Sequence, residues 1–246
     1  MKNWDEGRVV GVLGGLGPMA AAQFLETVAD RTVADSDQEH IDMMVSQHST
    51  TPDRTAYLFD NTAPNPAPVL VADAQMLERC GANFLVLTCN TGHAFADQIQ
   101  DAVDLELLGI LETTVTEVAR RATPGSKVAL LATDGTRKAR LYQDELEERG
   151  FEVVLPTDDD QKLIMELIYD QVKAGKDDRL DELHGVLQRL QSEGAEHFIL
   201  GCTELSVAAK ALDLLDHPEI VDSLQSLADA TIRRAGHQIK SPAPSA

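Results

Sequence analysis

The sequence is poor in cysteine, in positive charge and in long apolar runs, and each scarcity excludes a class of protein. Only three cysteines occur in 246 residues, and no two form a Cys-x-x-Cys pair, so we expect reduced thiols and no disulfide framework. Lys and Arg number 21 against 41 Asp and Glu, and the net charge of −20 repels nucleic acids and anionic membrane surfaces. No run approaches the roughly 18 apolar residues that span a bilayer, and the N-terminus lacks the apolar core of a signal peptide. We therefore expect a cytoplasmic protein that binds neither nucleic acid nor membrane.

What is present is an ordinary globular composition, with 43% hydrophobic and 25% charged residues. Short apolar runs rich in Val, Ile and Leu alternate with amphipathic stretches, which is typical of a parallel sheet covered by helices on both faces. The fold class is therefore α/β. We predict strands over 8–15, 41–47, 83–89, 126–133, 151–156 and 196–202, and helices over 18–32, 66–80, 91–103, 138–150, 160–175, 178–194 and 221–236.

The two halves of the chain repeat the same steps. Each half contains a strand that ends in a cysteine followed by polar residues: "LTCNTGH" with Cys89 and "LGCTEL" with Cys202. This repetition suggests a duplicated unit and two similar lobes related by a pseudo-twofold axis, with the active site between them. We expect residues 1–106 plus about 212–240 to form the first lobe and 107–211 the second, with a disordered tail over 241–246.

The position of the two cysteines indicates reactivity. A residue at the carboxyl end of a parallel strand, next to a helix N-terminus, lies where α/β folds bind ligands, and the helix N–H groups there favour an anion such as a thiolate. A single cysteine at the end of an apolar strand is more often a core residue than a catalyst. Two of them at equivalent places in two similar halves favour catalysis, whereas Cys80, which follows a helix, has no such setting.

Two facing thiols suit one reaction in particular. If the strand ends converge on one cleft, one sulfur can remove a proton from a carbon while the other donates a proton to the opposite face, which inverts the stereocentre without a cofactor. The chain here resembles the cofactor-independent aspartate/glutamate racemases. The resemblance is carried by "GGLGPMA", "QHSTTPDR", "LTCNTGH" and "LGCTEL", in family order and over nearly the whole chain.

The resemblance implies roles for individual residues. Cys89 and Cys202 match the two catalytic cysteines, each acting as base for one enantiomer and as conjugate acid for the other. Arg54 and Lys173 match basic residues that contact a substrate carboxylate, which favours a dicarboxylic amino acid. Glu204 is either a residue that orients the site or a helix N-terminal carboxylate. The remaining substrate-binding positions implied are Gly15, Thr50, Thr51, Asn90, Thr91 and Thr203, with Gly14 and Gly17 in the same glycine loop as Gly15. The resemblance also implies a homodimer, no metal and no cofactor.

Several alternatives stay open. The wider superfamily includes hydantoin racemases, maleate isomerases and arylmalonate decarboxylases, and a non-catalytic dicarboxylate-binding protein would use the same cleft. The choice between aspartate and glutamate is also open. "GLGPMA" fits a dinucleotide fingerprint, but the second strand ends in "SQHST" without the acidic residue that binds the ribose, so an NAD site is disfavoured. His93 could form a Cys-x3-His metal pair with Cys89, but no further ligand spacing supports zinc.

Overall fold

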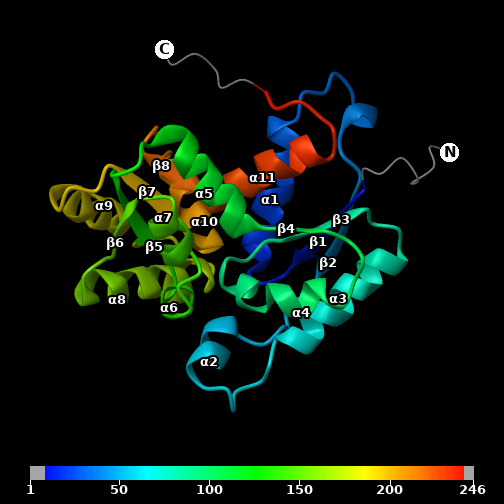
Figure 1. The fold of residues 1–246 in the computed structure, drawn as a ribbon, viewed down its shortest axis with the longest axis horizontal. Coiled ribbons are helices and arrows are strands. Elements are labelled where there is room, and N and C mark those ends of the chain that lie inside the picture. Colours follow the sequence, from blue (N-terminus) through cyan, green and yellow to red (C-terminus); the bar gives the residue numbers. More distant parts are fainter. Residues whose placement is uncertain (1–8, 241–246) are drawn as a thin grey trace.

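The structure, a computed structural model, describes residues 9–240 and consists of two parallel four-stranded sheets flanked by helices (Figure 1). The strand order is β2-β1-β3-β4 in the first sheet and β6-β5-β7-β8 in the second, so the same topology occurs twice. We name the first lobe by the sheet β1–β4 and the second lobe by the sheet β5–β8. The predicted α/β class with two similar lobes is confirmed, and the predicted tail over 241–246 lies outside the described residues.

The strands form because they are short apolar runs that both sheet faces bury; β1, β3 and nearly all of β5 and β7 are fully buried. The strands are β1 (Val10–Gly14), β2 (Met43–Gln47), β3 (Phe84–Leu87), β4 (Leu107–Leu108), β5 (Lys127–Leu131), β6 (Glu152–Val154), β7 (His197–Leu200) and β8 (Ile220–Asp222). The longer helices are α1 (Pro18–Arg31), α3 (Ala67–Arg79), α5 (Ile110–Arg121), α8 (Asp158–Glu166), α9 (Glu182–Ser192), α10 (Thr203–Ala211) and α11 (Ser223–Arg234).

The strand pairings differ from the expected lobe boundaries at two short strands. Leu107 and Leu108, expected to begin the second lobe, form β4 and pair with β3 of the first sheet. Strand β8, expected in a segment that returns to the first lobe, pairs with β7 of the second sheet. The helix that follows it, α11, does pack on the first lobe, because Leu224 and Leu227 share a core cluster with residues of β1 and α1.

Three predicted helices are interrupted in the structure. The stretch 91–103 is a 3-10 helix, η3 (Thr91–Phe95), followed by α4 (Ala96–Gln100), and 138–150 contains only α7 (Gln143–Glu148) after the separate α6 (Asp134–Lys138). The stretch 160–175 begins as α8 and continues as a π-helix, η4 (Leu167–Val172). π-Helical turns occur frequently at functional sites, and this one lies directly before Lys173.

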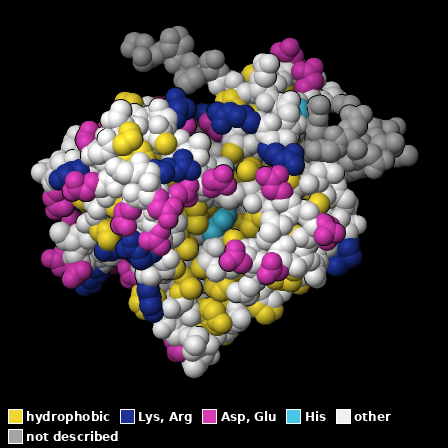
Figure 2. All heavy atoms as spheres, in the orientation of Figure 1, with side chains coloured by type: hydrophobic (Ala, Val, Ile, Leu, Met, Phe, Trp, Pro, Cys, Tyr) yellow, Lys and Arg dark blue, Asp and Glu magenta, His cyan; other side chains and the backbone are white. Residues whose placement is uncertain are grey.

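The carboxyl ends of the central strands of both sheets meet between the lobes. In each sheet the two central strands connect onward to strands on opposite sides, and such a switch point opens a crevice at the carboxyl end. Helix α2 (Arg54–Phe59), from the first lobe, packs against α6 of the second lobe, and Figure 1 shows α2 projecting at the junction. In Figure 2 the surface is hollowed between the two lobes. Among the described residues, no helix is long and apolar enough to cross a membrane.

Candidate active site

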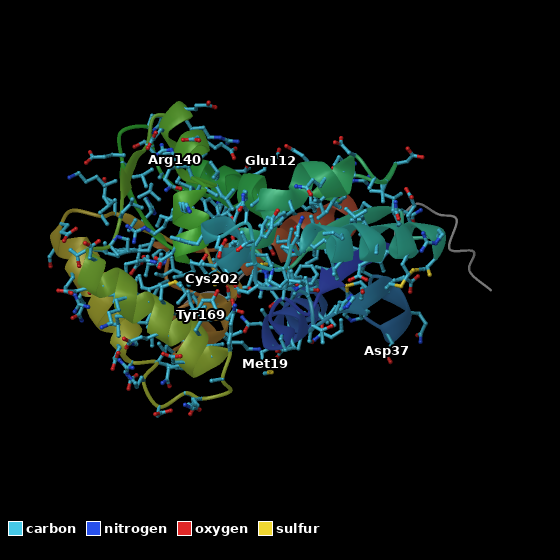
Figure 3. All side chains as sticks on the ribbon, turned by 90° about the horizontal axis from the view of Figure 1, so that it is seen from below. Met19, Asp37, Glu112, Arg140, Tyr169 and Cys202 are labelled. Atoms are coloured by element: carbon cyan, nitrogen blue, oxygen red, sulfur yellow. The ribbon has the colours of Figure 1, made fainter. Side chains whose placement is uncertain are left out.

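The two cysteines singled out by the sequence occupy equivalent positions in the two lobes. Cys89 lies two residues after the end of β3, and Cys202 lies two residues after the end of β7, where it is the N-cap of α10. Their exposed fractions are 6% and 5%, whereas Cys80 is exposed. Both line one small pocket between the lobes, which we call the inner pocket. Figure 3 shows Cys202 and Tyr169 near the middle of the molecule, where the lobes meet.

Cys89 is surrounded by donors. Its sulfur accepts a hydrogen bond from the backbone N–H of Gly92 at 3.3 Å. The Arg54 guanidinium lies beside it: burial would lower the pKa of Arg54, but negative charge on Cys89 and on Asp53 outweighs burial and leaves that pKa above its ordinary value. A backbone N–H and a guanidinium thus both lie next to the Cys89 sulfur.

Arg54 is held in place mainly by backbone carbonyls. Its guanidinium donates to the carbonyl oxygens of Leu16 at 2.7 Å and Pro52 at 3.2 Å. Its side chain is buried, with 7% exposed, and Nε has no hydrogen-bond partner among residues 9–240. A buried donor without a partner costs free energy, and a ligand that accepts from it would recover that cost. Arg54 therefore offers one unsatisfied N–H, on Nε, at the inner pocket.

Cys202 has the opposite environment. Its thiol donates a hydrogen bond to Glu204 Oε2 at 3.0 Å. Burial and then the Glu204 carboxylate raise the pKa of Cys202 well above its ordinary value, and the nearby Lys173 ammonium opposes them. Burial and the hydrogen bond to Glu204 both favour the protonated form of Cys202. Glu204, with 4% exposed, both contacts the thiol and stands at the N-terminus of α10, so the two sequence interpretations of this residue are compatible.

Lys173 connects the two lobes through charge. Its Nζ lies 3.9 Å from Asp53 Oδ2 and 3.9 Å from Glu204 Oε1, and 4.1 Å from the centre of the Tyr169 ring. Burial would lower the pKa of Lys173, but the charges around it, the Glu204 carboxylate foremost, outweigh burial and leave that pKa above its ordinary value. Both carboxylates are beyond hydrogen-bonding distance, so the charge of the ammonium is balanced while its three N–H donors have no hydrogen-bond acceptor among the described residues.

The side chains expected to bind substrate next to the cysteines are instead engaged within the protein. Asn90 donates to Ser223 Oγ at 3.0 Å, and Thr91 Oγ1 lies 2.9 Å from the hydroxyl of Thr133. Thr203 Oγ1 donates to the carbonyl of Thr88 at 3.5 Å. All three expected residues line the inner pocket, so their backbone N–H groups and unused donors are the groups left for a ligand.

A second, larger pocket opens beside the first, and we call it the outer pocket. The outer pocket has a cavity volume of about 250 Å³, whereas the inner pocket has about 10 Å³, roughly the space of one water molecule. Arg54, Lys173 and Glu204 are among the residues that line both pockets, so the two pockets share a wall. The inner pocket is too small for an amino acid as these side chains stand, and a ligand that contacts both cysteines would have to displace some of them.

The residues expected from the first lobe's loops lie mostly at the outer pocket. Gly15 lines it with φ of +91°, and a Cβ there would lie 2.5 Å from the backbone nitrogen of His48, so only glycine fits. Thr51 also lines it, and its hydroxyl donates to the His48 carbonyl at 2.7 Å. Thr50 is exposed and lines neither pocket, whereas its neighbours Ser49 and Thr51 both line the outer pocket.

His93 holds the Cys89 loop rather than a metal. Its Nδ1 lies 2.8 Å from the Cys89 carbonyl, and its Nε2 accepts the backbone N–H of Ile110 at 3.2 Å, which assigns the proton to Nδ1. Burial lowers the pKa of His93 to about 4, so the ring is neutral at physiological pH. Within residues 9–240, no group of three or more His, Cys, Asp or Glu side chains is placed to hold a metal ion.

Sequence reasoning missed several residues of the inner pocket. Asp53 is the N-cap of α2, and the backbone N–H of Ala56 and the Lys173 ammonium hold its pKa below the ordinary value although burial alone would raise it. Tyr169 donates to Asp53 at 3.1 Å, and Thr133 follows β5. Asp53 stands next to Arg54 in "TPDR", and Thr133 ends the strand predicted over 126–133, so both had a signal in the sequence; Tyr169 had none.

This geometry agrees with the comparisons to known proteins. The family described as Asp/Glu/Hydantoin racemase matches residues 13–231. The chain belongs to this family. The family resemblance drawn from the four sequence motifs is therefore confirmed, and membership supports an amino-acid racemase activity.

Individual relatives of the racemase family cover almost the entire chain. The broad-specificity amino-acid racemase RacX of Bacillus subtilis is 28% identical over 91% of this chain and 96% of its own length. The Picrophilus torridus aspartate racemase structure has a TM-score of 0.84 at 26% identity, covering 95% of this chain and 96% of its own. Glutamate racemase from Aquifex pyrophilus, with a TM-score of 0.58 and 18% identity over 92% of this chain and 82% of its own, shares the fold.

Proposed function

We propose that this protein is a cofactor-independent amino-acid racemase in which Cys89 and Cys202 act on opposite faces of the substrate Cα. The observation that carries the proposal is that two buried thiols, at equivalent strand ends of two lobes with the same topology, line one pocket. A pocket that only binds a ligand gains nothing from two ionisable sulfurs, which also invite oxidation.

The two sulfurs start the reaction in different states. Cys89 accepts the Gly92 N–H and lies beside Arg54, so it is the base that removes the Cα proton from one enantiomer. Cys202, whose thiol donates to Glu204, is the acid that delivers its proton to the opposite face of the planar intermediate. After one turnover the proton lies on Cys89 and the product has inverted configuration. The other enantiomer reacts from that second state with the roles exchanged.

The charged groups of the pocket suit an amino-acid zwitterion. The Thr203 N–H at the start of α10 has no acceptor within the helix and can bind the α-carboxylate together with the unsatisfied Arg54 Nε. The α-ammonium pairs with Glu204 Oε1, which is buried and has no hydrogen-bond partner among the described residues. The free N–H donors of Lys173 then remain for a second carboxylate.

We therefore propose an acidic substrate, aspartate or glutamate, bound with its side-chain carboxylate at Lys173. A second candidate is a broad range of side chains, because Asp53 and Glu204 already balance the charges of Arg54 and Lys173 and the relative RacX has broad specificity. Under this alternative the side chain extends into the outer pocket, next to Met19 and other apolar residues.

The test is racemisation measured by chiral chromatography, with reduced protein and no added pyridoxal phosphate. L-Aspartate, L-glutamate, L-homoserine, L-lysine and maleate are supplied separately. The proposal predicts D-product from the acidic pair, lost in Cys89→Ala and in Cys202→Ala and kept in Cys80→Ala, which is the matched control for an exposed thiol. Equal turnover of lysine and homoserine would favour the broad racemase. Conversion of maleate alone would contradict racemisation.

The proposal also includes a homodimer in the cytoplasm. Reduced cysteines, two of them buried and none paired, are typical of a reducing compartment. Light scattering after size-exclusion chromatography measures the mass directly, and a monomer mass at micromolar concentration would contradict the dimer.

A further inference from the structure

The loop that carries Cys89 is fastened to the opposite lobe on both sides of the cysteine. Thr88, directly before it, accepts a hydrogen bond from Thr203 of the second lobe through its carbonyl. Asn90, directly after it, bonds to Ser223, and Thr91 bonds to the hydroxyls that follow β5. The three residues that flank Cys89 thus take their partners from segments that directly follow β7, β8 and β5 of the second sheet.

Asn90 is the most fully engaged of these three. Its Oδ1 accepts a hydrogen bond from the Tyr142 hydroxyl, and its Nδ2 donates to Ser223 Oγ at 3.0 Å. Ser223 in turn donates to the carbonyl of Leu200 at 2.7 Å. Tyr142 and Ser223 are fully buried and Asn90 is 2% exposed, so water does not replace these bonds.

The chain of hydrogen bonds has one direction. Burial raises the pKa of Tyr142 above its ordinary value, so the phenol stays protonated. Its hydroxyl is therefore the hydrogen-bond donor to Asn90 Oδ1. The Ser223 hydroxyl donates its one proton to the Leu200 carbonyl, so its oxygen is the acceptor for Asn90 Nδ2. The bond from Tyr142 and the bond to Ser223 therefore require the same orientation of the Asn90 amide. The chain of hydrogen bonds runs from Tyr142 through Asn90, next to Cys89, and through Ser223 to Leu200, two residues before Cys202.

We propose that Tyr142 is a positioning residue that, through Asn90 and Ser223, fixes the spacing between Cys89 and Cys202. This role rests on the proposed two-cysteine racemisation. Tyr142 contributes nothing to the inner pocket itself, since it belongs to a core cluster of the second lobe and is absent from the pocket lining. Its function is to hold the Cys89 loop across the lobe interface.

The proposal predicts a particular failure when the spacing is loosened. After Cys89 has taken the Cα proton, the intermediate is protonated on the opposite face by Cys202 only if that sulfur stands in place, and an error of about 1 Å can cost 100-fold. A misplaced Cys202 leaves the proton on Cys89 time to exchange with solvent. In D2O, the same sulfur then returns deuterium to the original face, and labelled substrate of unchanged configuration accumulates.

The experiment compares Tyr142→Phe and Ser223→Ala with two matched controls. Tyr57→Phe removes a tyrosine hydroxyl that makes no hydrogen bond within the described part of the chain and leaves the tilted contact of its ring with Phe95 in place. Ser226→Ala removes a buried hydroxyl one turn along α11 whose one hydrogen bond among the described residues is local, to the carbonyl of Asp222 four residues earlier. Racemisation and Cα deuterium in the recovered starting enantiomer are measured in D2O by chiral chromatography with mass spectrometry.

We expect both network variants to lower kcat about tenfold, with less change in KM, and to raise the ratio of labelled starting enantiomer to product at least threefold. The double variant should lose less than the product of the two single effects, because both break one chain. Normal ratios in Tyr142→Phe and Ser223→Ala, even with a lowered melting temperature, would reduce Tyr142 to a structural residue and overturn the proposal. If the wild-type protein does not racemise any of the substrates, the proposed function itself is overturned. This outcome is distinguishable from failure of the Tyr142 proposal because it is measured on the wild type alone.

Discussion

Replacing Glu204 by Gln should make Cys202 the more reactive thiol. Glu204 Oε2 accepts the Cys202 proton at 3.0 Å, and its charge is one of the causes that raise the pKa of Cys202. Gln keeps the size of the side chain but removes the charge. Lys173, 3.9 Å from Glu204, would then act on the thiol without an opposing carboxylate and would stabilise the thiolate.

The structure sets the size of the effect. Both partners are nearly inaccessible, with 5% of Cys202 and 4% of Glu204 exposed, so water screens little of their interaction. A hydrogen bond to a charged group contributes about 1.5–3 kcal/mol, which corresponds to roughly ten- to a hundredfold in the population of thiolate. Alkylation follows the thiolate population, so the rate for Cys202 should rise by about the same factor.

The assay measures the ratio of Cys202 to Cys89 alkylation by iodoacetamide at neutral pH with mass spectrometry. Both sulfurs line the inner pocket, so a change in how often this pocket opens affects both rates and largely cancels in their ratio. Glu26→Gln is the matched control. Glu26, in α1, forms an exposed ion pair with Lys210, which lies on α10 as Glu204 does. A ratio in Glu204→Gln equal to that of the wild type would refute the account of Cys202 as a thiol held protonated by Glu204.

Three further predictions concern the surroundings of the site. Asp222→Asn keeps the helix cap to the Gln225 N–H but removes a buried carboxyl whose pKa burial raises from 3.8 to about 6, so its stability relative to wild type should grow by on the order of 3 kcal/mol from pH 4 to pH 7 in urea titrations. His93 changes stability with pH in the opposite direction, because its pKa is 6.5 ordinarily and about 4 in the folded protein, so the unfolded chain binds more protons. The free energy of unfolding should therefore fall by a similar amount from pH 6.5 to pH 4, and it should fall less steeply in His93→Leu. Gly17→Ala places a Cβ 2.5 Å from Glu204 Oε1, and racemisation should fall about tenfold while the melting temperature changes little.

Each of these predictions has a result that contradicts it. A constant difference between Asp222→Asn and wild type across the pH range would mean that the carboxyl is not titrating as a buried group. An unchanged acid slope in His93→Leu would assign the slope to other residues. Full activity in Gly17→Ala would show that Glu204 can move without loss of chemistry.

The sequence was sufficient for the central strands and for the cysteines because both depend on local patterns. Apolar runs of four or more residues marked the central strands, and a thiol at the end of such a run marked the site. The edge strands β4 and β8 have only two and three residues, too short for a periodic pattern, and so the lobe boundary was misplaced at both.

The partners of the cysteines depend on tertiary contacts and could be predicted less well. Tyr169 and Lys173 reach the inner pocket through a π-helical turn, which no α-helical periodicity anticipates. Tyr142 contacts Asn90 across 52 residues of chain and the lobe interface. Arg54 was expected as a substrate ligand, but its extensive bonds to backbone carbonyls could be found only from the fold.

The central claim is that Cys89 and Cys202 serve opposite faces of one carbon, and hydrogen exchange at Cα in the two single-cysteine variants tests it most directly. Cys89→Ala and Cys202→Ala are each incubated in D2O with the L- and, separately, the D-enantiomer of the preferred substrate. The account predicts that neither variant racemises, that each exchanges the Cα hydrogen of one enantiomer only, and that the two variants select opposite enantiomers. Exchange of the same enantiomer by both variants, or racemisation retained in either, would contradict it.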